Sequence, residues 1–253
     1  MRILALYDVH GNLEAVEAVL GDPRAAGADV VVVGGDVVPG PFAVEVLDRL
    51  EGLDVPTRWL RGNGEREVAE VAAARVEPEH DPADMAVVTA ILNARTLGPE
   101  RAGALGALPM TVEVDGVLFC HATPTSDVEI LTRVSAPERY AAALAGVAGS
   151  SLVVAGHTHQ QDDRVVGGVT RFVNAGSVGL PYEGDGAARW LWIEDGEPVL
   201  LSTAYDHAGA GARILASGWP DRDSTGAAMT ELVEASVITE LFEGRAAAVG
   251  RGG

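Results

Sequence analysis

With 253 residues and 47% hydrophobic content, the chain can bury one large core, or at most two small ones. All 18 basic residues are Arg and the formal net charge is −19, so nucleic-acid binding through a basic patch is excluded. The one cysteine, Cys120, rules out an intramolecular disulfide, and its apolar neighbours predict a buried, unreactive thiol.

The first part of the chain alternates strands and helices. An apolar strand is predicted over 2–7, followed by a helix that Asn12 caps. A valine-rich strand over 29–34 suits a sheet that is covered on both faces. Pro41 is well placed in the first turn of a second helix, and a third strand follows over 57–61. This order predicts a parallel sheet with right-handed crossovers.

The rest of the chain favours helices and β-hairpins. Residues 65–108 are rich in alanine and predict helices that are interrupted at Pro78 and Pro82. Pairs of apolar runs flank two-residue turns, which predicts three hairpins, at Asp115-Gly116, Gly167-Gly168 and Asp195-Gly196. The remaining predicted elements are a strand over 151–155 and helices at about 137–147, 206–217 and 227–242, before a frayed tail.

Parallel strands first and hairpins later predict a fold of the α/β (α+β) class, a four-layer α-β-β-α sandwich of two mixed sheets flanked by helices. Without an internal repeat or linker, residues 1–253 are expected to form one domain, with helices at about 205–243 as an extension.

The extension carries four apolar residues, Leu232, Val233, Val237 and Leu241, which we expect to pack in the core. Two alternatives stay open: the extension could cover the active site, or it could form a subunit interface and so a homo-oligomer. No apolar run reaches the ~18 residues that span a bilayer, and the first run is too short for a signal peptide. We therefore expect a cytoplasmic protein without membrane contact.

Five short polar motifs each close an apolar strand. In chain order they are Asp8-Val9-His10, Gly34-Gly35-Asp36, the stretch from Arg61 to Glu65 that contains Asn63, Cys120-His121, and Gly156-His157-Thr158-His159. Residues spaced i and i+2 on an extended segment point to the same side, so the first and last motifs predict two bidentate clamps. Two Asp, one Asn and four His at strand ends form a set that divalent metals occupy.

Each motif alone has another interpretation. Asp36 after two glycines is typical of a turn former or a helix cap. Asn63 between glycines is typical of a left-handed turn, and His121 of a buried histidine with satisfied hydrogen bonds. The occurrence of all five at strand ends favours a shared site, whereas His80 and His207 lie in polar contexts and are expected at the surface.

In this order the motifs resemble those of the calcineurin-like metallophosphoesterases, whose pattern is Asp-x-His, Gly-Asp, Gly-Asn, a lone His and Gly-His-x-His. The stretch 174–181 resembles a further signature of the small bacterial phosphodiesterase branch, and the resemblance spans Met1 to about residue 203. It implies a phosphoesterase with two divalent ions, drawn from Mn, Fe, Zn, Co or Ni.

The resemblance also implies the ligands of both ions. One ion would be held by Asp8, His10, Asp36 and His159, and the other by Asp36, Asn63, His121 and His157. Asp36 would bridge the ions, which at about 3.5–4 Å apart activate a bridging hydroxide and clamp phosphate oxygens. Asp36, Asn63 and His157 would thus be catalytic as metal ligands, and no separate protein acid or base is assigned.

One position departs from the family pattern. Many relatives carry His after the Gly-Asn, where it is thought to protonate the leaving group, and this chain carries Gly64. Good leaving groups should therefore be favoured. Arg66 is a candidate phosphate contact, or else a helix residue paired with Glu70. Asn12 is a candidate substrate contact through its helix N-terminus, or else a simple cap.

The substrate expected from these features is a small phosphodiester or phosphoanhydride. Two alternatives stay open. One is a protein phosphatase or dinucleoside tetraphosphate hydrolase. The other is a non-catalytic, metal-binding interaction scaffold on the same fold, as in the retromer small subunit, whose metal motifs are degraded.

Overall fold

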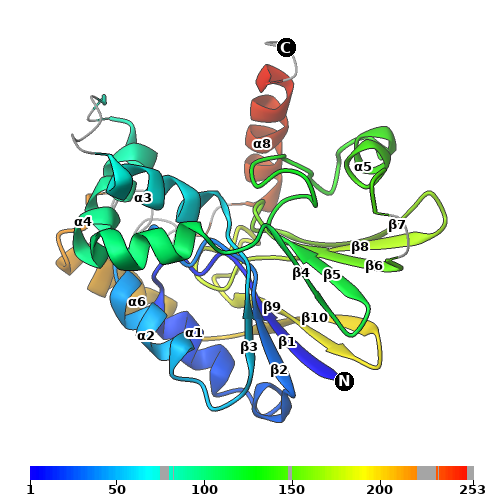
Figure 1. The fold of residues 1–253 in the computed structure, drawn as a ribbon, viewed down its shortest axis with the longest axis horizontal. Helices are drawn as coiled ribbons and strands as arrows, with labels where there is room; N and C mark the ends of the chain where they lie inside the picture. Colours follow the sequence, from blue (N-terminus) through cyan, green and yellow to red (C-terminus); the bar gives the residue numbers. More distant parts are fainter. Residues whose placement is uncertain (75–79, 82, 148–149, 221–231, 233, 250–253) are drawn as a thin grey trace.

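The computed structural model describes residues 1–74, 80–81, 83–147, 150–220, 232 and 234–249. Two five-stranded mixed sheets face each other, with strand orders β10-β9-β1-β2-β3 and β4-β5-β6-β8-β7 (Figure 1). The first sheet consists of β1 (Arg2–Leu6), β2 (Val30–Val33), β3 (Thr57–Trp59), β9 (Ala188–Glu194) and β10 (Glu197–Thr203). The second consists of β4 (Thr111–Val114), β5 (Val117–Cys120), β6 (Leu152–Ala155), β7 (Gln161–Val166) and β8 (Thr170–Ala175).

Helices cover the outer faces of both sheets (Figure 1). The first sheet is covered by α1 (Leu13–Leu20), the short 3-10 helix η1 (Ala25–Gly27), α2 (Ala43–Glu51), α3 (Asn63–Ala73), α4 (Met85–Gly106) and α6 (His207–Ala216). The second is covered by α5 (Pro137–Ala143), while α8 (Ala235–Val249) stands at the upper end of the molecule in Figure 1. The predicted α-β-β-α sandwich of two mixed sheets is confirmed.

Alternating side chains divide the core into three layers. In β1, Ile3 and Ala5 pack between the two sheets, while Leu4 and Leu6 pack against the helices. In β5, Phe119 faces the layer between the sheets and Cys120 faces α5. Because successive residues of a strand point to opposite faces, a continuous apolar run fills two layers at once.

The parallel strands leave their carboxyl ends at one edge of the sandwich. β1 pairs in parallel with β2, and β2 with β3. In the other sheet, β5 pairs in parallel with β6, and β6 with β8. The antiparallel partners come from the three predicted hairpins, all of which are confirmed. Their Asp-Gly and Gly-Gly turns have the positive φ angles that two-residue hairpins require.

Several predicted helix boundaries differ from the structure. Pro41 lies before α2, which begins at Ala43, and the helix predicted at 137–147 ends at Ala143. Pro78 and Pro82 lie outside the described residues, whereas α4 is broken at Gly98, whose φ is 74° and ψ is 166°. Gly98 is followed by Pro99, a pair that favours a break, so the sequence carried this signal.

The C-terminal helix also departs from expectation. It continues through Val249, so the tail predicted to fray after Phe242 is helical for seven further residues. Leu232, Val237 and Leu241 are 54%, 57% and 49% exposed, so the prediction that they pack in the core is wrong; Val233 lies outside the described residues. Glu243 instead attaches α8 to the body through Ser135 and Arg139.

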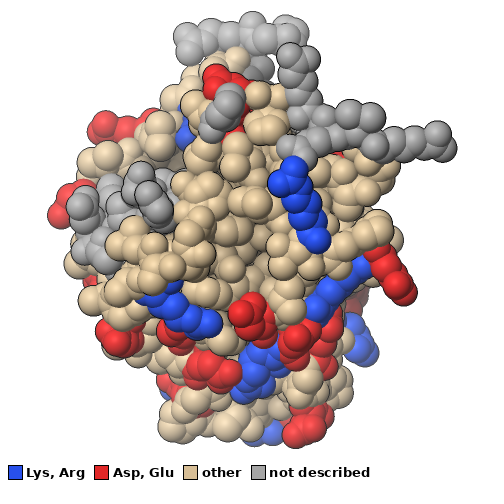
Figure 2. All heavy atoms as spheres, turned by 90° about the vertical axis from the view of Figure 1, so that its left-hand side faces the viewer, with Lys and Arg blue, Asp and Glu red and all other residues tan. Residues whose placement is uncertain are grey.

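Arg and acidic side chains are interspersed on the helical side of the molecule, along the lower part of the view in Figure 2. Ion pairs join neighbouring helices, such as Arg49 with Glu17 at 2.7 Å and Arg101 with Asp48 at 2.7 Å. The exclusion of nucleic acid stays a prediction. Among the described residues, no helix combines the length and the apolar composition that crossing a membrane requires.

The layer between the sheets should dominate stability. Phe119 is completely buried there, so Phe119→Ala should lower the free energy of unfolding by about 3–5 kcal/mol. Urea denaturation followed by circular dichroism measures the change. Val169→Ala, at a position that is 78% exposed, is the control and should shift it by less than about 0.5 kcal/mol. Equal effects of the two substitutions would contradict the assignment of this layer.

Candidate metal centre

The polar motifs meet where the parallel strands of both sheets end. The first sheet supplies Asp8, His10, Asp36 and Asn63, and the second supplies His121, His157 and His159. Backbone hydrogen bonds tie these ends together: Asp8 N–H donates to Gly35 O at 3.1 Å, and Gly156 N–H donates to His121 O at 2.8 Å. The fold thereby fixes residues that are up to about 150 positions apart in the chain on one edge.

Six of these side chains form two groups, and within each group the potential ligand atoms all lie within 4.8 Å of one another. One group contains Asp8, His10 and His159, and the other contains Asp36, His121 and His157. Asp36 connects them, because its Oδ2 is 3.8 Å from His10 Nε2 and 3.4 Å from His121 Nε2. His157 and His159 belong to different groups, so the expectation that they form one clamp is wrong.

The clamp prediction assumed an extended backbone, and the backbone here is left-handed. The φ angles of Asp8, His10, Asp36, His157 and His159 are 51°, 46°, 51°, 69° and 56°. Among the described residues, the other non-glycine residues with positive φ are Asp115 and Asp195, in hairpin turns. Such strain persists only where the surroundings fix it, and it is concentrated at functional sites.

The histidine rings are oriented by backbone carbonyl groups. His10 Nδ1 lies 3.1 Å from Pro39 O, His159 Nδ1 lies 2.8 Å from Leu180 O, and His121 Nδ1 lies 3.0 Å from Gly34 O. Since a carbonyl oxygen only accepts hydrogen bonds, each Nδ1 carries the proton. Whenever such a ring is neutral, its Nε2 atom carries the free lone pair, the arrangement usual for histidines that bind metal.

Unsatisfied polar atoms show that the residues fit bound cations. Among the described residues, the buried atoms Asp8 Oδ1, Asn63 Oδ1 and His121 Nε2 have no hydrogen-bond partner. The Nε2 atoms of His10 and His159 face each other at 3.2 Å. Buried groups of this kind are costly unless something satisfies them, and a divalent ion would satisfy oxygen and imidazole ligands together.

The protonation states of Asp36, His10 and His157 suit ligation as well. Burial and the nearby His121 lower the pKa of His157 to about 4, and burial and His159 lower the pKa of His10. Burial opposes ionisation of Asp36, but the positive charge of His121 outweighs it and lowers the pKa of that carboxyl. Burial also lowers the pKa of His121, but the Asp36 carboxylate prevails and raises it to about 10. A cation would therefore displace a proton from His121.

Comparison with known proteins agrees with this geometry. The sequence profile of the calcineurin-like phosphoesterase superfamily domain matches residues 1–193. The chain belongs to the calcineurin-like phosphoesterase superfamily. No functionally curated protein matches the chain significantly.

Two solved structures share the superfamily fold with this chain. A metallophosphoesterase from Sphaerobacter thermophilus is 24% identical, with a TM-score of 0.72 over 92% of this chain and 99% of that protein. A hypothetical protein from Pyrococcus horikoshii OT3 is 18% identical, with a TM-score of 0.72 over 92% of this chain and 98% of that protein. At these identities the similarity shows the fold, and residue roles rest on this chain's own geometry.

Gly64, the position at which the sequence departs from the family pattern, has no room for a side chain. A Cβ atom built there would lie 1.9 Å from Val38 O and 2.9 Å from Pro39 Cδ. The Gly64 N–H donates to Asp36 Oδ1 at 2.8 Å, so moving this backbone would also disturb Asp36. The absence of the histidine is therefore built into the packing of the two loops.

Arg66 and Asn12 have structural partners. Arg66 contacts Asp127 through Nε at 2.8 Å and Glu70 through Nη1 at 3.4 Å, so the predicted pairing with Glu70 is present. Asn12 Oδ1 accepts from Ala15 N at 3.1 Å as the cap of α1, while Nδ2 donates to Gly179 O at 2.8 Å and Tyr205 OH at 3.2 Å. Contact of Arg66 or Asn12 with substrate stays a prediction.

Glu65 is a supporting residue that the motifs alone did not reveal. It is 1% exposed, and its carboxylate accepts from four backbone amides: those of Asp36, Val37 and Gly62 at 2.8 Å each, and that of Val38 at 3.2 Å. Burial and the Asp36 carboxylate raise its pKa to about 7. A Glu three residues into a helix often bonds back to the first turn, which was the available signal.

The stretch 174–181 supports the loops of both sheets. Asn174 Nδ2 donates to Gly156 O at 2.6 Å, and Ser177 Oγ donates to Asp8 O at 2.6 Å. His159 is held against the end of this stretch through Leu180 O and stacks on the Tyr182 ring, with centroids 4.9 Å apart. The stretch therefore positions Asp8 and His159 of one ligand group, and holds Gly156, the residue before His157.

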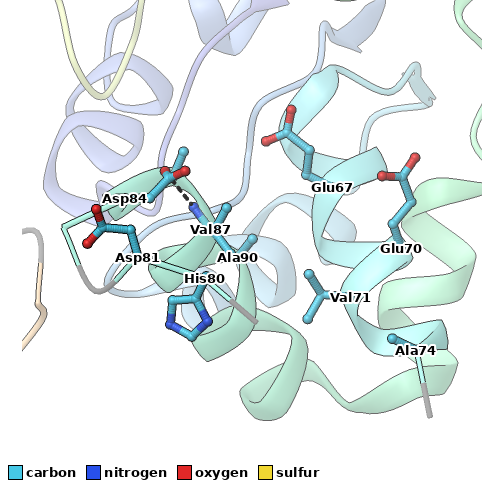
Figure 3. A pocket seen from close by; sticks show the side chains of 10 residues that line it. Glu67, Glu70, Val71, Ala74, His80, Asp81, Asp84, Val87 and Ala90 are labelled. Atoms are coloured by element: carbon cyan, nitrogen blue, oxygen red, sulfur yellow. Dashed lines mark hydrogen bonds between the residues drawn. The ribbon is translucent and has the colours of Figure 1, made fainter. Parts of the chain in front are cut away.

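A cavity of about 680 Å³ lies between α3 and the start of α4, close to Asn63, and is acidic. Figure 3 shows Glu67 and Glu70 on one wall, with Asp81, Asp84 and His80 on the other. Glu67 Oε1 accepts from Asn63 Nδ2 at 3.3 Å, which connects this wall to the centre. Four carboxylates would repel a phosphate group, so we exclude this cavity as the path of an anionic substrate.

Glu65 should be essential for the shape of the centre. Glu65→Gln exchanges one acceptor oxygen for an NH₂ group facing amide donors, so it should weaken Mn²⁺ binding by about 10- to 100-fold. Calorimetric titration of the metal-free protein with Mn²⁺ measures the affinity, and thermal unfolding checks that the variant folds. Glu70→Gln, on the solvent side of the same helix, is the matched control. Unchanged Mn²⁺ affinity in Glu65→Gln would contradict the positioning role.

Proposed function

We propose that the chain is a dinuclear metal-dependent phosphoesterase that hydrolyses a small phosphodiester or phosphoanhydride. The observation that carries the proposal is the pair of ligand groups joined by Asp36, each within 4.8 Å, at the ends of strands from two facing sheets. Membership of the superfamily supports metal-dependent phosphoester hydrolysis in general.

The donor set suits the proposed cofactors. Imidazole, carboxylate and amide oxygen ligands together fit Mn²⁺, Fe, Zn²⁺, Co²⁺ or Ni²⁺. Asp8, His10, Asp36 and His159 would hold one ion, and Asp36, Asn63, His121 and His157 the other. When bound, two such ions would lower the pKa of a water molecule and neutralise charge on the phosphate oxygens.

The residues around the centre limit the choice of leaving group. In hydrolysis, a water oxygen bonds to phosphorus, an ester P–O bond breaks, and the departing oxygen keeps the electron pair. Gly64 has no side chain to protonate that oxygen, and the packing against Val38 leaves no space for one. Esters whose leaving groups are stable as anions should therefore react best.

The acidic character of the chain limits the partners in the same way. With a net charge of −19, productive contact with a phosphate depends on local positive charge at the centre. A small phosphorylated substrate satisfies this condition, because it needs no broad basic surface. A cytoplasmic location and a homo-oligomeric assembly remain predictions.

Removing one ligand should abolish turnover. In Mn²⁺, Asp36→Asn and His157→Ala should each lower kcat/KM for bis(4-nitrophenyl) phosphate by about 100-fold or more. The control is His80→Ala, since His80 lies outside both ligand groups. Elemental analysis of each purified variant reports metal content independently of activity. Activity retained with Asp36→Asn would refute the proposed site.

The native protein should prefer diesters. We expect faster turnover of bis(4-nitrophenyl) phosphate than of 4-nitrophenyl phosphate, because no protein acid assists departure from a dianionic monoester. Steady-state release of nitrophenol measures both rates. Faster turnover of the monoester would favour the phosphatase alternative, and absence of both metal and hydrolysis would favour the interaction scaffold.

A further inference from the structure

A second, apolar cavity of about 140 Å³ lies directly beside the candidate metal centre. It is lined by residues 39–41 and by His10, Thr89, Leu180 and Trp219. The His10 imidazole forms one wall, and its Nε2 lies 3.2 Å from His159 Nε2. A substituent that fills the cavity therefore contacts His10, and only the His10 side chain separates it from Asp8 and His159, the other members of that ligand group.

Apart from the His10 imidazole, the backbone carbonyls and the hydroxyl group around this cavity are bonded within the protein. Asn93, which is 2% exposed, accepts from Gly40 N at 2.9 Å and donates to Gly40 O at 3.1 Å. Pro39 O accepts from His10, and Leu180 O accepts from His159. The Thr89 hydroxyl donates to Met85 O of its own helix at 2.7 Å. A sugar or charged group would lose its hydration here without replacement, so an apolar occupant is favoured.

Trp219 forms the largest apolar side chain of the cavity lining and is held by apolar neighbours. It is 9% exposed and packs in one cluster with Phe42 and Ile214, against which Leu180 and Tyr205 also pack. The backbone N–H of Trp219 donates to Ser217 Oγ at 3.2 Å, which ties the residue to the end of α6. Trp219 follows α6 and lies beyond residues 1–193, which the superfamily profile matches, so the C-terminal extension completes the cavity.

We propose that this cavity is the subsite for an apolar ring-sized ester group of the substrate, and that Trp219 determines the preference for it. The proposal rests on the proposed phosphoesterase function. The size agrees, since an apolar cavity of about 150 Å³ binds benzene. A nucleobase would bring polar edges that find no free partner among the bonded groups above, so the occupant is an uncharged aryl group.

Phenylphosphonate and methylphosphonate test the proposal, because they share a phosphonate head and differ in the ring. Calorimetric titration of the Mn²⁺-loaded protein should show about tenfold tighter binding of phenylphosphonate. Trp219→Ala should remove that preference and leave methylphosphonate binding unchanged, whereas Trp219→Phe should retain most of it. Leu215→Ala, on the exposed side of α6, is the matched control for the extension.

A second variant tests the cavity without altering Trp219. Thr89→Leu adds apolar volume from α4 and should weaken phenylphosphonate binding alone, since the cavity is then partly filled. Equal binding of the two phosphonates by the native protein would overturn the subsite and leave the phosphoesterase proposal intact. A loss of methylphosphonate binding in Trp219→Ala would also overturn it. If neither phosphonate bound the native protein, the phosphoesterase proposal would be refuted, and the subsite with it.

Discussion

Asp36 is the residue on which the candidate centre depends, because its carboxylate joins the two ligand groups. One oxygen accepts from Gly64 N–H and the other faces His10 and His121 at 3.8 and 3.4 Å. Another rotamer of the Asp36 side chain would break the hydrogen bond from Gly64 N–H and move the nearest carboxylate away from the buried His121. The left-handed φ of 51° directs the side chain inward from the end of β2.

Strain of this kind has to be offset elsewhere in the molecule. Left-handed backbone costs roughly 1–2 kcal/mol for each non-glycine residue, and five proposed ligands adopt it. The apolar layer between the sheets, with Phe119 and Tyr7 fully buried, holds the strand ends together. Glu65 then holds the loops after β2 and β3 in place through four amide hydrogen bonds. Packing therefore maintains a geometry that the local backbone would not choose.

Much of the fold was predictable because its signals are local. Asp195-Gly196 between two apolar runs indicates a hairpin from a few neighbouring residues. The valine run of β2 likewise indicates a strand with apolar cover on both faces. The conformation at His157 and His159 was not predictable from spacing, because these residues lie beyond the end of β6. Long-range bonds, such as those from Glu65 and Asn174 to distant loops, leave no periodic trace in the sequence.

The contrast between local motifs and long-range contacts also applies to the proposed metal ligands and the proposed apolar subsite. The proposed ligands occur in short motifs because strand ends place them on one edge, and each motif needs only a few neighbouring residues. The lining of the apolar cavity instead combines His10, residues 39–41, Thr89, Leu180 and Trp219, which come from five separate parts of the chain. Their shared property is that the polar groups beside them are already bonded, which is a feature of the folded state alone. On the proposed function, a change at an apolar side chain such as Trp219 would alter the substrate preference of this protein while the proposed ligand motifs stay the same.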